Sequence, residues 1–230
     1  MEKKYVFGIA LLILVLAGAG AALYVLPKMS SPDEQLQDYA LLESLAAKTP
    51  ESQEFFEKAR NQDEEIRENP HNLDAYVAAS LSWKALGSMT GEKAFYQHAR
   101  AVIHQQIKRP GGENAGNYLN LGNLSRLLGE QDKAIRYYRK GIELAPGDEQ
   151  AHIALANYYR ELEKSPDEVI AVYKEGLRRV AQRNVSLILE MANYMTLVGR
   201  KQEARELYIL LFEKDPSNPY FRAKIDELSK

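Results

Sequence analysis

The chain has 230 residues, with 14 glycines, 9 prolines, no cysteine and 45% hydrophobic residues. This composition is that of a folded chain, and the lack of cysteine excludes disulfide bonds, thiolate metal sites and covalent c-type haem attachment to it. The formal net charge is −2 and the basic residues are scattered, which argues against nucleic-acid binding through a global basic surface.

The first element in chain order is an uncharged apolar run, Tyr5–Leu26. A helix of this length spans about 33 Å, enough to cross a hydrocarbon core of about 30 Å. Lys3 and Lys4 precede the run, so the positive-inside rule places the N-terminus in the cytoplasm and everything after Pro27 across the membrane. Residues 1–28 are therefore predicted to be a cytoplasmic tail and a single-pass anchor.

Two other interpretations of this run stay open. In a cleaved signal peptide, residues 7–16 would be the apolar core and the small residues 17–21 would offer cleavage sites. A pilin-like leader would be cut after Gly8, but Ile13 stands where such segments usually have glutamate. The glycines and alanines at 17–22 also form a small-residue stretch, which suits close approach of a partner membrane helix.

Residues 29–70 are predicted to be a helical spacer or a degenerate repeat. Ser31-Pro32-Asp33-Glu34 combines an N-cap, a first-turn proline and a capping box, and it predicts a helix with Leu36 on its apolar face. Thr49-Pro50 predicts a second helix, which ends before Pro70 because a residue that precedes proline disfavours the helical conformation. The apolar residues of this second helix are Phe55, Phe56, Ala59 and Ile66.

From His71 onward the chain repeats itself, most clearly at residues 115–148. The characteristic positions of this unit are Tyr118, Leu121, Gly122, Gly129, Ala134, Tyr138 and Pro146. Small residues let two helices cross closely, and large aromatic residues fill the space beside the crossing. Tyr138, Tyr173 and Tyr208 follow one another at intervals of 35 residues, which marks one position in successive units. The unit at 149–184 lacks the turn glycine.

This pattern resembles the tetratricopeptide repeat (TPR) family. The resemblance covers about residues 71–218 as four TPR-like repeats, and residues 219–230 follow as a predicted capping helix. It implies an all-α fold in which an N-terminal transmembrane helix precedes a right-handed superhelix of helix-turn-helix units.

The sequence offers little for catalysis. It contains no phosphate loop, dinucleotide fingerprint, HExxH motif or nucleophile elbow. None of its four histidines lies at metal-ligand spacing from another, and His152 stands at a core packing position of its repeat. We therefore expect no enzyme activity, no catalytic residue, no metal, no cofactor and no nucleic-acid partner.

The resemblance also implies a peptide-binding groove, because the first helix of each TPR pair lines the concave face. Three asparagines recur at one position of successive repeats, and an amide both donates and accepts hydrogen bonds, so the ladder suits an extended peptide backbone. Basic side chains beside it suit a carboxylate such as a peptide C-terminus. The predicted peptide-binding residues are Lys84, Leu119, Asn123, Arg126, Leu127, Ile153, Asn157, Arg160, Leu189 and Asn193.

The groove departs from carboxylate-clamp TPR domains, which place basic residues one turn earlier on the same helices. Those positions hold Val77, Leu119 and Ile153 here, so a more apolar groove is expected. The overall layout is similar to anchored bacterial TPR proteins of cytochrome c maturation and of the secretion translocon. It implies an inner-membrane scaffold or assembly factor whose periplasmic TPR domain binds a partner polypeptide. The alternative is a permanent structural subunit of a membrane complex, such as a respiratory or surface-appendage machine.

A reporter enzyme that folds only outside the cytoplasm, fused after Lys230, is expected to be active in cells because the positive residues precede the apolar run. The matched control is the same fusion without residues 5–26, which should be inactive. Activity of a cytoplasm-specific reporter alone at this position would contradict the predicted topology.

Overall fold

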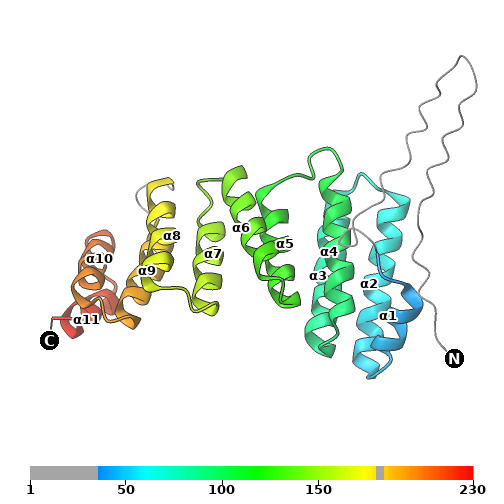
Figure 1. Ribbon diagram of the computed structural model, residues 1–230, viewed down its shortest axis with the longest axis horizontal. Coiled ribbons are helices and arrows are strands. Elements are labelled where there is room, and N and C mark those ends of the chain that lie inside the picture. Colours follow the sequence, from blue (N-terminus) through cyan, green and yellow to red (C-terminus); the bar gives the residue numbers. More distant parts are fainter. Residues whose placement is uncertain (1–35, 180–183, 230) are drawn as a thin grey trace, which may run out of the picture.

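The computed structural model describes residues 36–179 and 184–229, which form eleven α-helices and no strand. The helices follow one another along the long axis of the molecule, so the predicted all-α repeat fold is confirmed for these residues (Figure 1). They are α1 (Tyr39–Ala46), α2 (Pro50–Glu68), α3 (Leu73–Thr90), α4 (Lys93–Ile107), α5 (Ala115–Leu128), α6 (Gln131–Leu144), α7 (Glu149–Glu161), α8 (Pro166–Arg179), α9 (Val185–Leu197), α10 (Lys201–Lys214) and α11 (Pro219–Glu227).

The N-terminal predictions have different outcomes. The apolar run Tyr5–Leu26 and the predicted capping box at residues 31–34 lie outside the described residues. In the part of the chain that the structure describes, no helix combines the length and the apolar character needed to cross a membrane. The expected helical position of Leu36 is wrong, because α1 begins only at Tyr39, where the Asp38 side chain accepts a hydrogen bond from the Ala40 N–H.

The buried carboxylate of Asp63, on α2, connects α1 to the helices that follow it. Asp63 Oδ2 accepts hydrogen bonds from the Tyr39 hydroxyl at 2.7 Å and from Trp83 Nε1 at 2.9 Å. His98 Nε2 lies 2.8 Å from the same oxygen, while its Nδ1 accepts from the Gln37 N–H at 3.1 Å. His98 therefore donates from Nε2 to Asp63. Because Gln37 gives its N–H to a histidine, it does not extend α1 toward the N-terminus.

The second predicted helix is confirmed as α2. Thr49 is its N-cap and forms a reciprocal capping box with Ser52, and Pro50 occupies the first turn. The helix ends at Glu68, two residues before Pro70, and its apolar residues Phe56, Ala59 and Ile66 are buried. The local sequence is therefore sufficient to define this helix.

Within successive helix pairs, glycines allow close crossings. A Cβ atom at Gly122 of α5 would lie 2.6 Å from the ring atoms Cδ1 and Cε1 of Tyr138 on α6. The same contact recurs between Gly87 of α3 and Tyr96 of α4, where the nearest ring atom would be 2.5 Å away. These tyrosine rings occupy space that any larger residue would need, so the tight crossing predicted at Gly122 is confirmed.

Glycine also shapes the turns within the pairs. Gly129 (φ 79°) and Gly199 (φ 78°) adopt the left-handed conformation after α5 and α9. In the unit that lacks a turn glycine, Glu163 takes φ 53° after α7 and is the sole non-glycine residue with positive φ among the residues described. A side chain in this conformation is strained by roughly 1 kcal/mol or more.

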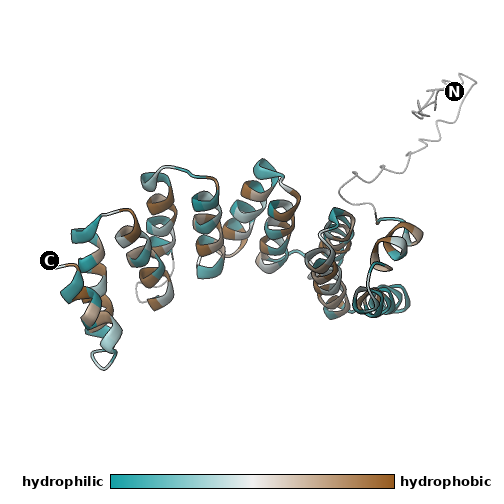
Figure 2. Ribbon diagram, turned by 90° about the horizontal axis from the view of Figure 1, so that it is seen from below, coloured by the Kyte–Doolittle hydropathy of each residue, from teal (hydrophilic) through white to brown (hydrophobic). Residues whose placement is uncertain are grey.

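The apolar side chains form two cores. Helices α1–α4 and the face of α5 that bears Leu121, Leu124 and Leu128 form the N-terminal core. Helices α6–α11 form the C-terminal core, which begins with Ala134 and Tyr138. Apolar faces turn toward neighbouring helices along the whole stack (Figure 2). The boundary falls within the α5–α6 pair, so that pair joins the two halves of the molecule.

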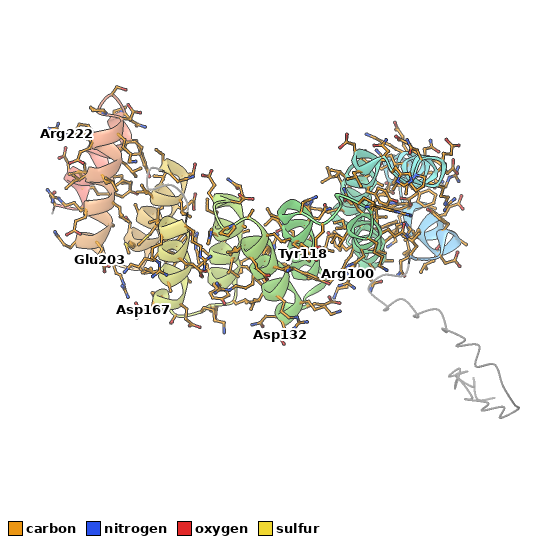
Figure 3. All side chains as sticks on the ribbon, turned by 90° about the horizontal axis from the view of Figure 1, so that it is seen from above. Arg100, Tyr118, Asp132, Asp167, Glu203 and Arg222 are labelled. Atoms are coloured by element: carbon orange, nitrogen blue, oxygen red, sulfur yellow. The ribbon has the colours of Figure 1, made fainter. Side chains whose placement is uncertain are left out.

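The helix stack is curved (Figure 3). Helix α5 contacts α7, and α7 contacts α9, whereas successive second helices α6, α8 and α10 have few or no contacts with one another. In a curved stack the inner helices lie closest together. Helices α5, α7 and α9 therefore line the concave side, while Asp132 and Asp167, at the starts of α6 and α8, lie along the outer edge (Figure 3).

Replacing Gly122 with leucine is expected to lower the melting temperature of the folded chain. Leucine in place of glycine stabilises the helix itself by about 1 kcal/mol. Overpacking of the leucine side chain against Tyr138, however, costs roughly 1–3 kcal/mol or more. Gly147→Leu is the control, since its Cβ would meet its nearest neighbour only at 4.0 Å. If circular dichroism gives the same melting temperature for the two variants, the helix crossing at Gly122 accommodates a leucine side chain without loss of stability, which would contradict this prediction.

Candidate functional site

Two adjoining cavities open on the concave side. The first, of about 330 Å³, lies between α5 and α7 and is lined by Leu119, Asn123, Arg126, Tyr138, Gln150, Ile153, Ala154, Asn157, Tyr158 and Glu161. The second, of about 800 Å³, lies between α7 and α9 and is lined by Asn157, Arg160, Glu161, Glu163, Lys164, Glu190, Tyr194, Leu197 and Val198. Because Asn157 and Glu161 border both cavities, we treat the two as one inner groove that crosses α5, α7 and α9.

The structure brings together six of the ten predicted peptide-binding residues in this inner groove: Leu119, Asn123, Arg126, Ile153, Asn157 and Arg160. The other four lie elsewhere. Leu127 packs against the N-terminal core and lines neither cavity, although it lies one helical turn after Asn123 on α5. Lys84 is on α3, which has few or no contacts with α5, and it lines neither cavity. Leu189 and Asn193, on α9, also line neither cavity.

Asn157, in the middle of the inner groove, has a defined amide orientation. Its Oδ1 lies 3.1 Å from Arg160 Nη1 and 3.5 Å from the Tyr173 hydroxyl. A guanidinium group can only donate hydrogen bonds, so the amide oxygen must face Arg160. The Nδ2 group is therefore turned away from both of these residues.

Asn123, on the neighbouring helix, repeats this arrangement. Its Oδ1 accepts a hydrogen bond from the Tyr138 hydroxyl at 2.8 Å. Burial raises the pKa of Tyr138, and the positive charge of nearby Arg126 opposes part of this effect. Burial also raises the pKa of Tyr173 in the next repeat, and nearby Arg160 opposes part of this effect. In each repeat the arginine lies three residues after the asparagine on the same helix.

Asn193, in the last pair, reaches the same orientation with other residues. Its Oδ1 accepts from the Tyr208 hydroxyl at 2.6 Å and from the Tyr220 hydroxyl at 3.2 Å. Thr196 stands where the earlier repeats have arginine, and it donates to the Ala192 carbonyl at 2.9 Å. Tyr220 belongs to α11, so the final helix completes this hydrogen-bond arrangement.

The two arginines of the inner groove are held by groove side chains. Arg126 Nη1 lies 3.1 Å from both carboxylate oxygens of Glu161, which is on the next repeat. Burial lowers the pKa of Arg126, but the hydrogen bond to Glu161 and the negative charge of Glu161 act against this and hold the pKa above its usual value. The Arg160 guanidinium lies over the Tyr194 ring, 5.3 Å from its centroid. Both arginines thus contact groove residues on the next repeat.

Sequence reasoning missed several groove residues. Tyr158 and Tyr194 line the two cavities, and each directly follows a ladder asparagine, so the recurring Asn-Tyr dipeptide was a usable signal. Glu161 follows Arg126 by 35 residues, which matches the tyrosine interval and predicts a contact between adjacent repeats. Glu190 has no comparable signal, because the equivalent position on α7 is Ala154.

The described residues of the inner groove form no candidate metal site. Within residues 36–179 and 184–229, no group of three or more His, Asp or Glu side chains is placed to hold a metal ion. His152 is fully buried, and its Nε2 lies 3.1 Å from the Pro146 carbonyl oxygen, as its predicted packing role requires.

Comparisons with known proteins agree with the repeat assignment. The tetratricopeptide repeat family model matches residues 115–148. A comparison with curated proteins found no match. Among solved structures, the C-terminal part of a TPR repeat-containing protein from Cytophaga hutchinsonii is 11% identical, with 83% of this chain and 70% of that chain covered and a TM-score of 0.59.

Two further structures are similar over most of their length. The crystal structure of MamA is 14% identical, with 79% of this chain and 96% of that chain covered and a TM-score of 0.53. A thermophilic TPR protein of Thermus thermophilus is 16% identical, with 83% of this chain and 98% of that chain covered and a TM-score of 0.51. At these identities the likeness shows a shared TPR fold alone.

The buried tyrosines predict loss of stability at alkaline pH. Burial raises the pKa of Tyr138 to about 12 and also raises that of Tyr173. The unfolded chain ionises near the ordinary tyrosine value of about 10, so it releases these protons first and folding stability falls as pH rises above about 10. Absorbance at 295 nm should show tyrosines that stay neutral until the chain unfolds. Tyr138→Phe should remove one of them, and an unchanged count would contradict the assignment.

Proposed function

We propose that this chain is a protein–protein interaction scaffold that holds an extended segment of a partner polypeptide in the inner groove. The observation behind this proposal is the groove itself: two adjoining cavities on the concave side share Asn157 and Glu161 and run across three successive first helices. Such a track is long and open, which suits an extended chain. Helical-repeat proteins use concave surfaces of this kind for binding.

The chemistry of the inner groove supports a polypeptide ligand. Leu119 and Ile153 offer apolar contacts while remaining partly exposed, and Asn123 and Asn157 line the same cavity. A polypeptide presents apolar side chains and backbone polar groups at regular intervals, so both features find partners. Nothing in this lining points to a reacting group, and the proposed role is non-enzymatic.

The proposal includes a location. The apolar run Tyr5–Leu26 supports a single-pass anchor in a bacterial inner membrane, with the helical repeats on the periplasmic side. The anchored layout, as read from the sequence, supports assembly or escort of a partner protein, as in cytochrome c maturation or secretion. Tethering the groove to the membrane would raise its effective concentration for partners that are also at the membrane.

Replacing Asn123 and Asn157 together with alanine is expected to leave the melting temperature nearly unchanged, because both side chains are only half-buried. Capture of the partner should weaken by roughly 1–3 kcal/mol, since buried peptide groups would lose their hydrogen-bond donors. The measurement is photo-crosslinking in native membranes from a reactive residue placed at Ile153, with quantitative mass spectrometry. Asn61→Ala with Asn120→Ala is the matched control, because neither lines a cavity.

One outcome would defeat the proposal. If the double variant folds normally and crosslinks the same partners at the same yield, the inner groove is not the binding surface. Binding would then involve the convex face or the membrane segment, as expected of a permanent structural subunit.

A further inference from the structure

We propose that His98 is a proton-operated latch on the segment that leads into α1. The neutral imidazole holds the backbone N–H group of Gln37, and a proton on the same ring nitrogen releases it. The residues of the latch lie among α1–α4 and none of them lines the inner groove. This inference therefore goes beyond the proposed function and does not depend on it.

The hydrogen bonds of His98 define where its proton lies. A backbone N–H group can only donate, so the 3.1 Å contact from Gln37 requires a lone pair on His98 Nδ1. The ring proton is then on Nε2, which lies 2.8 Å from Asp63 Oδ2. The ring thus accepts on one side and donates on the other. A doubly protonated imidazolium donates from both nitrogens and cannot keep the contact with Gln37.

Asp63 is arranged as a carboxylate that favours a second proton on His98. Its Oδ2 accepts from the Tyr39 hydroxyl and from Trp83 Nε1 as well as from the histidine. Within residues 36–179 and 184–229, its Oδ1 is buried without a hydrogen-bond partner. A buried negative charge that only neutral donors surround is unfavourable. A proton on His98 would turn the Nε2 contact into a buried ion pair, which compensates this charge.

The groups around the ring leave histidine as the titrating member. The titratable and charged groups that the neighbouring described helices bring to this cluster are Tyr39 from α1 and Asp63, Glu64 and Arg67 from α2. Helix α3 contributes the uncharged Trp83, whose ring centroid lies 4.5 Å from that of His98. The single charged residue of α5, Arg126, lines the inner groove instead. Tyr39 stays a neutral donor, because burial and its hydrogen bond to Asp63 raise its pKa.

The direction of the pH response follows from the proton count. Histidine is the side chain that ordinarily changes its charge between about pH 5 and pH 8. A proton on Nδ1 would place two N–H donors against each other at the Gln37 contact. The released state therefore binds one more proton than the latched state, and its population rises as the pH falls.

Helix α1 depends on this cluster at its start. Gln37 is bonded to α4 through His98, and Tyr39 is bonded to α2 through Asp63. The helix has only 8 residues, and isolated helices shorter than about 12 residues are marginal in water. Release of Gln37 is therefore expected to loosen the first turn of α1. In the sequence this segment separates the apolar run Tyr5–Leu26 from the repeats, so the latch couples pH to the connection between them.

The test follows a spin label on α1 in the detergent-solubilised full-length chain. Because the chain has no cysteine, Ala40→Cys, at an exposed position in the first turn, directs a thiol-specific label to that position alone. The mobile fraction of its electron paramagnetic resonance signal is expected to rise at least about threefold from about pH 7.5 to about pH 5.5, where histidine ordinarily gains its proton. A label at Asn61→Cys, exposed on α2, is the control and should not respond.

Variants of the cluster identify the titrating group. His98→Asn keeps an acceptor oxygen near the position of Nδ1 but gains no proton in this range, so the label at Ala40→Cys should lose its response to pH. His71→Asn, at an exposed position, is the matched control and should keep the full response. Asp63→Asn removes the charge that favours the imidazolium, so the response should move to lower pH.

A second measurement needs no variant. In the nitrogen nuclear magnetic resonance spectrum of the unchanged chain, His98 should have a proton on Nε2 alone at about pH 7.5 and on both nitrogens at about pH 5.5. A proton on Nδ1 at the higher pH would overturn the latch, even if the variants fail to fold. A label on α1 that does not respond to pH, or a response that survives His98→Asn, would overturn it as well. Each of these results leaves the proposed role of the inner groove unaffected.

Discussion

The structure depends on the contact between Gly122 and Tyr138. The tyrosine ring lies where a Cβ atom at position 122 would be, so α5 and α6 cross closely only because residue 122 has no side chain. The same tyrosine sends its hydroxyl past the crossing to Asn123 in the inner groove. One side chain therefore fills the helix crossing and orients a polar group on the binding surface. This joint role explains why each of these tyrosines follows a groove asparagine by 15 or 16 residues.

Much of the fold was predictable because its determinants are local. Thr49, Pro50 and Ser52 define the start of α2 without help from the rest of the chain. Gly122 and Ala134 predict a close crossing of two helices because both residues are small. The start of α1 was not predictable, because the Gln37 N–H bonds to His98, a residue 61 positions away. Long-range hydrogen bonds of this kind leave no local pattern in the sequence.

The site was predictable in position and less so in chemistry. Repeat register placed Asn123 and Asn157 on one face and brought Arg126 and Arg160 beside them. Register does not reveal that Arg126 pairs with Glu161, because side-chain direction depends on neighbouring repeats. Leu127 shows the same limit: it follows Arg126 directly, yet it packs against the N-terminal core. The sequence therefore could not show that both arginines of this groove already have partners within the protein.

The most direct measurement of the link between Tyr138 and the inner groove is the nuclear magnetic resonance spectrum of the asparagine side-chain amides, recorded with and without Tyr138→Phe. A hydrogen bond to Oδ1 polarises the amide and shifts its Nδ2 proton and nitrogen signals. We expect the Asn123 Nδ2 signals to move toward those of a solvent-exposed asparagine in the variant, while those of Asn61 on α2 stay in place. Identical Asn123 signals in the two proteins would contradict this expectation, since Tyr138 would then fill the crossing without orienting the groove.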